Sequence, residues 1–276
     1  MSVKFFGQFL IEQGEIDATQ LREALLRMDA QNRPLGEIAV EAGCLTRAAA
    51  DRINREQRNG DRPFGELACA LGLLTESQLD EVSTTQQKTR VQIGEVLVEL
   101  GSLEPDQLPR LLDEFKADQA PYEAEVQTLP GELDGNPVAH LVLDMLPKFC
   151  LRIAKVKMKT GFGLSLSRLA SFPYNVGLRM EGPPNLQVTL VADEHLGRKL
   201  AAATACIDEG RLDSDSVYDG LGEFLNVLCG NVAAALERDD VYVSLGPPVR
   251  DASLDGGIAF ELVVGEGCAS VVLATE

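Results

Sequence analysis

Residues 219–236, DGLGEFLNVLCGNVAAAL, predict the longest helix in the second half of the chain. Apolar side chains recur there every three or four positions, which is the spacing of a helix face packed against a sheet. That stripe, extended by one turn towards the N-terminus, comprises Val217, Leu221, Phe224, Leu225, Leu228, Val232 and Leu236. The opposite stripe comprises Asp219, Glu223, Asn226 and Gly230. We therefore expect a helix over about residues 215–237, with one buried and one exposed face.

Two glycines, Gly222 and Gly230, flank the polar pair Glu223 and Asn226. Because three positions separate the glutamate from the asparagine, both side chains project from the same helix face. Glycine inside a helix costs about 1 kcal/mol relative to alanine, so two of them require an explanation. Two interpretations stay open: another backbone approaches this face closely, or the helix packs tightly within its own domain.

The surrounding segments predict an α+β domain, in which helices lie beside an antiparallel sheet. The expected helices are residues 137–149 and 193–206, and the expected strands are residues 153–159, 162–166, 174–180, 186–191, 258–264 and 269–274. In the first strand, Lys155, Lys157 and Lys159 alternate with apolar residues. They indicate either a contact with an acidic partner or an exposed edge strand protected by lysine.

A boundary is expected at residues 118–136, DQAPYEAEVQTLPGELDGN. This stretch holds two prolines and two glycines and has little periodicity, which is typical of a linker. We place one domain at residues 1–119, a linker at 120–135 and a second domain at 136–276.

The first domain contains four repeats of 29 residues. One glycine recurs at Gly7, Gly36, Gly65 and Gly94, and a second at Gly14, Gly43, Gly72 and Gly101. An apolar residue follows at Ile16, Leu45, Leu74 and Leu103. Coincident spacing at three positions indicates an all-α repeat domain built from two-helix units.

Within each repeat, the second glycine ends a short helix in a left-handed conformation. The next helix begins near Asp17, Thr46, Thr75 and Glu104, where Asp17 with Gln20 and Thr75 with Gln78 fit capping boxes. Its inner face is predicted to carry Leu21 and Leu25 in the first repeat, and Leu108 and Leu112 in the fourth. A unit this small cannot bury its apolar face alone, so we expect each repeat to stack on its neighbour along the chain.

Composition excludes several classes of function. The chain has 25 Lys and Arg against 43 Asp and Glu, giving a net charge of −18. This acidity argues against binding to nucleic acid or to anionic lipid. No apolar run approaches the roughly 20 residues that span a bilayer. Acidic residues occur too early for a signal peptide, so we expect a cytoplasmic protein without membrane insertion.

Cysteines and histidines do not indicate a metal site. None of the six cysteines forms a C-x-x-C pair, and each lies in an apolar stretch, so we expect small buried thiols rather than disulfides or zinc ligands. His140 and His195 have no second ligand at a suitable spacing. We expect neither a metal nor a cofactor of its own.

The pattern Glu223-x-x-Asn226 followed by Gly230-Asn231 resembles the signature of the CheC/CheX/FliY chemotaxis phosphatases. The resemblance covers about residues 136–276. CheC-type members carry a second E-x-x-N in their first helix, but the corresponding residues 136–146, NPVAHLVLDML, have none. The resemblance therefore implies one site per chain, as in CheX.

This resemblance implies hydrolysis of the aspartyl phosphate on a response-regulator receiver domain. The receiver would supply the phosphoaspartate and its magnesium ion, Asn226 would orient the attacking water, and Glu223 would pair with the receiver's active-site lysine. A homodimer through the CheX-like domains is also implied. The alternative is a binding module that recognises a receiver or another partner without catalysis.

The repeats resemble the MshEN-type N-terminal domain of type II secretion and pilus assembly ATPases. The match lies in Leu35-Gly36 through Gly43, Leu45 and Thr46. Some MshEN domains bind cyclic di-GMP through an arginine directly before the Leu-Gly pair.

In this chain, that position is filled by Phe5, Pro34, Pro63 and Gln92, and arginine occurs one residue earlier, at Arg33 and Arg62. Binding of cyclic di-GMP is therefore not expected, and a regulatory or tethering role is favoured over a cyclic di-GMP sensor. The chain lacks the phosphate-binding loop G-x-x-x-x-G-K-[ST], so no ATPase is predicted.

Overall fold

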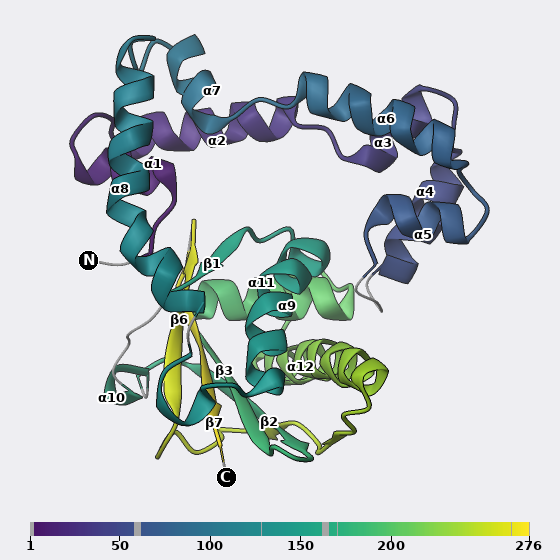
Figure 1. The fold of residues 1–276 in the computed structure, drawn as a ribbon, viewed down its shortest axis with the longest axis vertical. Coiled ribbons are helices and arrows are strands. Elements are labelled where there is room, and N and C mark those ends of the chain that lie inside the picture. Colours follow the sequence, from purple (N-terminus) through teal and green to yellow (C-terminus); the bar gives the residue numbers. More distant parts are fainter. Residues whose placement is uncertain are drawn as a thin grey trace. The chain divides into compact units, whose positions relative to one another are not determined.

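A computed structural model describes residues 3–57, 62–127, 129–161, 166–169, 171–265 and 267–275. The chain forms two compact units, one of residues Lys4–Pro121 and one of Val3 together with the residues from Tyr122 onward (Figure 1). The expected linker is partly helical, because helix α8 (Gln107–Gln127) continues through Pro121. An internal proline removes one backbone hydrogen bond, but here the helix continues past it. Beyond it, Leu129 and Leu133 are buried in the core of the second unit, so this stretch is also packed rather than free.

The first unit forms the two helices expected of each repeat. They are α1 (Phe6–Glu12) and α2 (Ala18–Gln31), α3 (Leu35–Glu41) and α4 (Arg47–Gln57), α5 (Phe64–Ala70) and α6 (Glu76–Thr89), and α7 (Ile93–Glu99) and α8. The glycine between the helices has a φ of 66° to 73° in all four repeats, a conformation that side chains with a Cβ rarely adopt. Capping boxes at Asp17 and Thr75 are confirmed.

Three positions of the repeat supply the buried core of this unit. They are Leu10, Ala39, Ala68 and Leu97; Ile16, Leu45, Leu74 and Leu103; and Ala24, Ile53, Val82 and Leu111. The prediction for Leu25 was wrong, because this side chain is 37% exposed and Ala24 is fully buried instead. Both residues fit a helix period from Leu21, and the small Ala24 is the one that faces the core shared with α7.

The repeats do not stack in chain order. The first and fourth share one core, which contains Leu10, Ala24, Leu97 and Leu111, while the second and third share another. The two segments that join these pairs are hydrogen-bonded to each other: the Asn32 side chain donates to the Val91 carbonyl and accepts from its N–H, both at 2.9 Å. The expectation of sequential stacking therefore holds only for the middle pair.

The second unit consists of an antiparallel sheet with its longer helices on one face (Figure 1). Its helices are α9 (Pro137–Ala154), α10 (Leu166–Leu169), α11 (Glu194–Ala205) and α12 (Ser214–Leu236), with single turns of 3-10 helix η1 (Gly131–Leu133), η2 (Glu209–Arg211) and η3 (Glu237–Asp239). Its strands are β1 (Met158–Thr160), β2 (Tyr174–Glu181), β3 (Leu186–Ala192), β4 (Ser244–Leu245), β5 (Val249–Arg250), β6 (Ile258–Val264) and β7 (Ala269–Ala274).

The strands lie in the order β1-β6-β7-β3-β2-β4, and β5 also pairs with β2. Alternate residues of β2 and β3, such as Val176, Leu178 and Val188, point into the core beneath α9, α11 and α12. A smaller cluster around Val191 and Val272 covers the opposite face near α10. This arrangement agrees with the α+β fold expected from the sequence.

The first predicted strand was placed too early. Helix α9 extends to Ala154, and Lys155 ends it with a left-handed φ of 58°. Phe149, Cys150 and Ile153 are buried and continue the apolar face of the helix, which outweighs the alternation that suggested a strand. Only Lys159 of the three lysines lies in the edge strand β1. The strand expected at residues 162–166 falls largely outside the described residues, and Leu166 belongs to α10.

The shared core of the first and fourth repeats can be tested by Leu111→Ala. Removing a buried leucine costs about 2–5 kcal/mol, so amide exchange measured by mass spectrometry should accelerate in α1 and α2, although they are distant in sequence. Val82→Ala, the matched change in the third repeat, should instead affect α3 and α4. Faster exchange in α5 and α6 but not in α1 and α2 of the Leu111 variant would contradict the pairing.

Burial also divides the cysteines. Cys150 and Cys229 are buried, and burial raises the pKa of both thiols, that of Cys229 to about 12. Cys206 and Cys268 are exposed, contrary to the expectation that every cysteine is buried. Iodoacetamide at pH 8 should therefore label Cys206 and Cys268 in the folded protein but spare Cys150 and Cys229, because the thiolate is the reactive form. Peptide mass spectrometry measures this, and labelling of Cys229 without unfolding would contradict it.

Candidate functional site

Helix α12 is held with its apolar stripe towards the sheet and its polar stripe outward. Leu221, Phe224 and Leu225 are fully buried. Gly220 lies against α11, where a Cβ on residue 220 would be 2.7 Å from the Cβ of Ala201 and 2.9 Å from its carbonyl oxygen. The N-terminus is capped by Asp213, which accepts a hydrogen bond from the Ser216 N–H at 2.8 Å. These contacts fix which residues of the helix face outward.

Glu223 and Asn226 lie next to each other on the outward face. Asn226 Nδ2 donates to Glu223 Oε2 at 3.4 Å, a long and weak hydrogen bond. Glu223 is exposed and Asn226 is half-buried. Within the part of the chain that the structure describes, no ion pair involves Glu223, so its carboxylate is available to a cation from outside. Together the two side chains offer an anion and an amide that both donates and accepts hydrogen bonds.

A segment that we name the wall, residues Ser244–Arg250, runs beside this pair. It pairs with β2, with Leu245 opposite Met180 and Val249 opposite Gly177. Pro248 packs on the helix, since a Cβ on Gly222 would lie 3.1 Å from the Cβ of Pro248. The wall therefore joins the sheet edge to the outward face of α12, and Gly222 serves packing within the unit.

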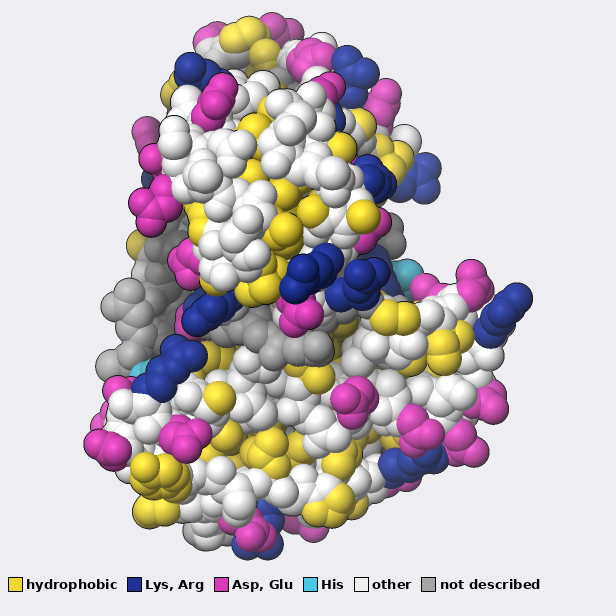
Figure 2. Space-filling model, turned by 90° about the vertical axis from the view of Figure 1, so that its right-hand side faces the viewer, with side chains coloured by type: hydrophobic (Ala, Val, Ile, Leu, Met, Phe, Trp, Pro, Cys, Tyr) yellow, Lys and Arg dark blue, Asp and Glu magenta, His cyan; other side chains and the backbone are white. Residues whose placement is uncertain are grey.

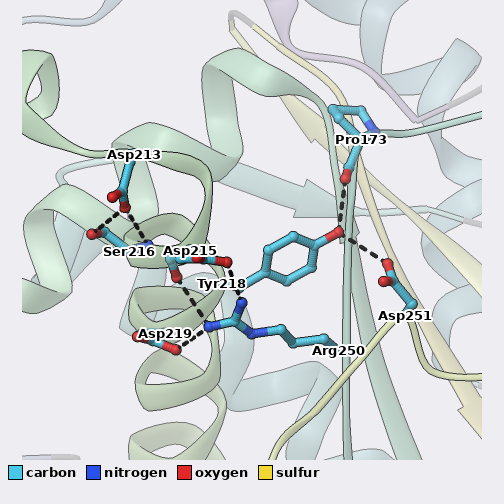
Figure 3. Close-up of polar contacts among 8 residues, drawn as sticks. All are labelled: Pro173, Asp213, Asp215, Ser216, Tyr218, Asp219, Arg250 and Asp251. Atoms are coloured by element: carbon cyan, nitrogen blue, oxygen red, sulfur yellow. Dashed lines mark hydrogen bonds and ion pairs between the residues drawn. The ribbon is translucent and has the colours of Figure 1, made fainter.

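Arg250 fastens the wall to the helix (Figure 3). Its Nη1 lies 2.6 Å from Asp215 Oδ1 and its Nη2 lies 2.5 Å from Asp219 Oδ1. The guanidinium carbon also lies 5.2 Å from the centre of the Tyr218 ring, within cation–π range. The hydrogen bonds that Arg250 donates to Asp219 and then to Asp215 raise the pKa of its guanidinium, which stays positively charged.

Tyr218 ties the same region to the sheet. Its hydroxyl lies 3.1 Å from the Pro173 carbonyl oxygen and 2.9 Å from Asp251 Oδ1 (Figure 3). Burial raises the pKa of Tyr218, and the nearby Asp251 carboxylate raises it further, so the hydroxyl stays protonated and can donate. Asp251 in turn donates its N–H to the Asn175 carbonyl of β2 at 2.8 Å.

The sequence-based predictions place Glu223 and Asn226 correctly on one outward stripe, although Asn226 is less exposed than expected. Asp219, on the same stripe, is engaged by Arg250. Sequence reasoning missed Arg250, Tyr218 and the wall. In the string LGPPVR at residues 245–250, an arginine directly after a short apolar pair was the available indication.

Neither the surface charge on the face shown in Figure 2 nor the possible metal ligands among the described residues offer a competing site. Over the face shown in Figure 2, Lys and Arg side chains lie among Asp and Glu side chains, so the excess negative charge there does not gather in one patch. Among the described residues, no group of three or more His, Cys, Asp or Glu could hold a metal ion. The described helices include none that is long and apolar enough to cross a membrane.

Residues 175–261 match the family model described as "Chemotaxis phosphatase CheX". The match includes β2, α12 with Glu223 and Asn226, and the wall. It supports a CheX domain in the second unit. Among curated protein sequences, none matches this chain.

Several solved structures are similar to about half of the chain. CheX from Desulfovibrio desulfuricans is 12% identical with a TM-score of 0.39, covering 50% of this chain and 99% of that one. CheX from Vibrio vulnificus is 15% identical with a TM-score of 0.41, covering 53% and 97%. A complex of CheX with CheY, BeF3 and Mg²⁺ from Borrelia burgdorferi matches at 14% identity and a TM-score of 0.40, covering 51% and 96%.

The two helix glycines Gly230 and Gly220 should respond oppositely to alanine. A Cβ on Gly230 would meet only Leu245 Cδ1, at 3.9 Å, so Gly230→Ala should raise the free energy of unfolding by up to about 1 kcal/mol through helix propensity. Gly220→Ala should lower it, because the new Cβ meets the backbone of Ala201. Urea denaturation measures both changes, and equal stabilities for the two variants would contradict the packing of α11 on α12.

Proposed function

We propose that the second unit is a phosphatase that hydrolyses the aspartyl phosphate of a response-regulator receiver domain. The observation that carries this proposal is the CheX family match across α12, together with the outward Glu223 and Asn226 that it contains. Two polar side chains three residues apart are common on exposed helix faces. The family match is what distinguishes Glu223 and Asn226 from an ordinary solvated pair. The unit needs no cofactor of its own in this proposal, because the receiver carries the magnesium ion.

The proposed reaction is an in-line attack of water on phosphorus. The bond between phosphorus and the aspartyl oxygen breaks, which releases inorganic phosphate and restores the aspartate carboxylate of the receiver. Asn226 is suited to hold the water, since its amide accepts one hydrogen bond while it donates another and does not change charge. Orientation of reactants contributes much of the rate in phosphoryl transfer, so a positioning residue suffices on this side of the complex.

Glu223 is proposed to dock the partner through the receiver's active-site lysine. Its carboxylate is exposed on the same face as Asn226, three residues away. An ion pair there would align the phosphoryl group with the amide of Asn226. Because the pair would form near the surface, its strength should fall with added salt.

We further propose that the repeat unit tethers or regulates the phosphatase unit and does not sense cyclic di-GMP. What supports the absence of cyclic di-GMP sensing is the state of Arg33, which Pro34 separates from the Leu35-Gly36 pair. Arg33 Nη1 lies 2.5 Å from Glu41 Oε2, and its Nε lies 3.9 Å from Glu37 Oε2. A guanidinium engaged by two carboxylates of its own repeat is poorly placed to bind a phosphate.

Asn226→Ala should lower the dephosphorylation rate of the receiver at saturation by about 100-fold or more, while leaving receiver binding and stability nearly unchanged. A partly exposed side chain leaves little cavity on truncation, so the stability change should stay within about 0.5 kcal/mol. Glu223→Gln should also weaken receiver binding, and added salt should reproduce part of that defect. The measurement is the decay of phosphorylated receivers from the same organism, with and without this protein.

Lys148→Ala is the control, because Lys148 lies outside the E-x-x-N signature, exposed on α9 in an ion pair with Asp144. It should retain wild-type activity. Failure of the wild-type protein to accelerate the decay of any receiver, combined with binding to one, would replace the phosphatase by a non-catalytic receiver-binding module. Equal activity of wild type and Asn226→Ala would remove Asn226 from the chemistry.

A further inference from the structure

The wall is attached to the sheet on one side and to helix α12 on the other, and Arg250 takes part in both attachments. On the sheet side, Arg250 pairs with Val176 of β2, and the Gly246 N–H donates to the Arg179 carbonyl at 2.8 Å. On the helix side, the guanidinium reaches Asp215 and Asp219, two turns and one turn before Glu223 respectively. The residues between these anchor points are thereby held over the helix.

The held residues border the Glu223–Asn226 pair with apolar groups. Pro248 covers Gly222, the residue directly before Glu223, and Leu245 lies beside Gly230, one turn after Asn226. Val249 is 53% exposed and Leu245 is 36% exposed, so the wall presents apolar surface to the outside on this flank. A protein docking on α12 at Glu223 would meet the wall at the same time.

Arg250 also changes the charge that such a partner meets. Asp215, Asp219 and Glu223 are spaced four residues apart and form a line of three carboxylates along one face of α12. Arg250 engages the first two with both of its terminal nitrogens, a geometry that lysine cannot reproduce because it is a single point charge. Glu223 is left as the member of the line that no described cation engages.

We propose that Arg250 is a positioning residue for receiver docking: it fixes the wall against α12 and leaves Glu223 as the carboxylate that meets the partner. The inference rests on the proposed phosphatase function for its partner, a phosphorylated receiver domain. Arg250 itself is not assigned a contact with the reacting atoms. Its loss should therefore weaken docking and leave the chemical step intact.

The experiment compares wild type, Arg250→Gln, Arg250→Lys and the double variant Asp215→Asn with Asp219→Asn. Amide exchange without any partner is measured first, and residues 244–250 should exchange faster in Arg250→Gln than in wild type. Steady-state dephosphorylation of the receiver follows, in which Arg250→Gln should raise KM by about tenfold and change kcat by less than about twofold. Arg250→Lys should recover only part of the loss. Lys148→Gln, which removes an exposed ion pair with Asp144 on α9, is the matched control and should change neither readout.

The double aspartate variant separates positioning from direct contact. If Arg250 acts through the two aspartates, their removal should raise KM as Arg250→Gln does, and the combined triple variant should show no further loss. A full additional loss in the triple variant would mean that Arg250 touches the receiver itself and would overturn the inference.

The remaining outcomes separate this inference from the proposed function. Unchanged exchange at residues 244–250, or an unchanged KM in an active Arg250→Gln protein, would overturn the inference while the phosphatase function stands. A wild-type protein that dephosphorylates no receiver would overturn the phosphatase function and the docking role with it, whatever the exchange measurement shows about the wall.

Discussion

The close contact between Gly220 and Ala201 determines how the whole second unit presents its surface. Residue 220 has no side chain to hold the two helices apart, so α12 lies close to α11 and both pack their apolar faces on the sheet. A helix fixed at that distance has no freedom to rotate, because Leu221 and Leu225 would leave the core. The outward direction of Glu223 and Asn226 is therefore a consequence of packing on the far side of the helix.

The wall connects the edge of the sheet to the candidate site on α12. A free edge strand exposes backbone groups that attract other strands, and β2 is covered by the wall on that side. The wall in turn spans from the edge to α12 through Pro248 and Arg250. The wall thus both protects the sheet edge and shapes the surface around Glu223. A change in the wall would therefore affect both.

Local periodicity predicted the elements in which the same face is buried from one end to the other. The strands at Ile258–Val264 and Ala269–Ala274 and the helix around Asn226 were placed almost to the residue. The wall was missed because its strands are two residues long and their partners lie about 70 residues earlier in the chain. Arg250 was missed for the same reason: its carboxylate partners are 31 and 35 residues away, and no local pattern records them.

Pairing of the repeats shows a different limit. Equivalent positions such as Ala24 and Leu111 are buried alike, so burial follows the repeat, but the repeat pattern does not tell which repeats share a core. Positions that differ between copies break this symmetry. Residue 50 is alanine where the other repeats carry Leu21, Leu79 and Leu108, and Gly36 consequently contacts Phe64 of the third repeat instead of a leucine of its own.

The bond between Asn32 and Val91 has a consequence for how this unit could have grown. The chain leaves the core shared by the first and fourth repeats at Asn32 and returns to it at Val91, and these two residues are hydrogen-bonded to each other. Insertions succeed where the two ends of the inserted piece lie close together. The second and third repeats therefore form an insertion within the first and fourth. A chain joined directly from residue 32 to residue 91 would keep the core of the first and fourth repeats closed.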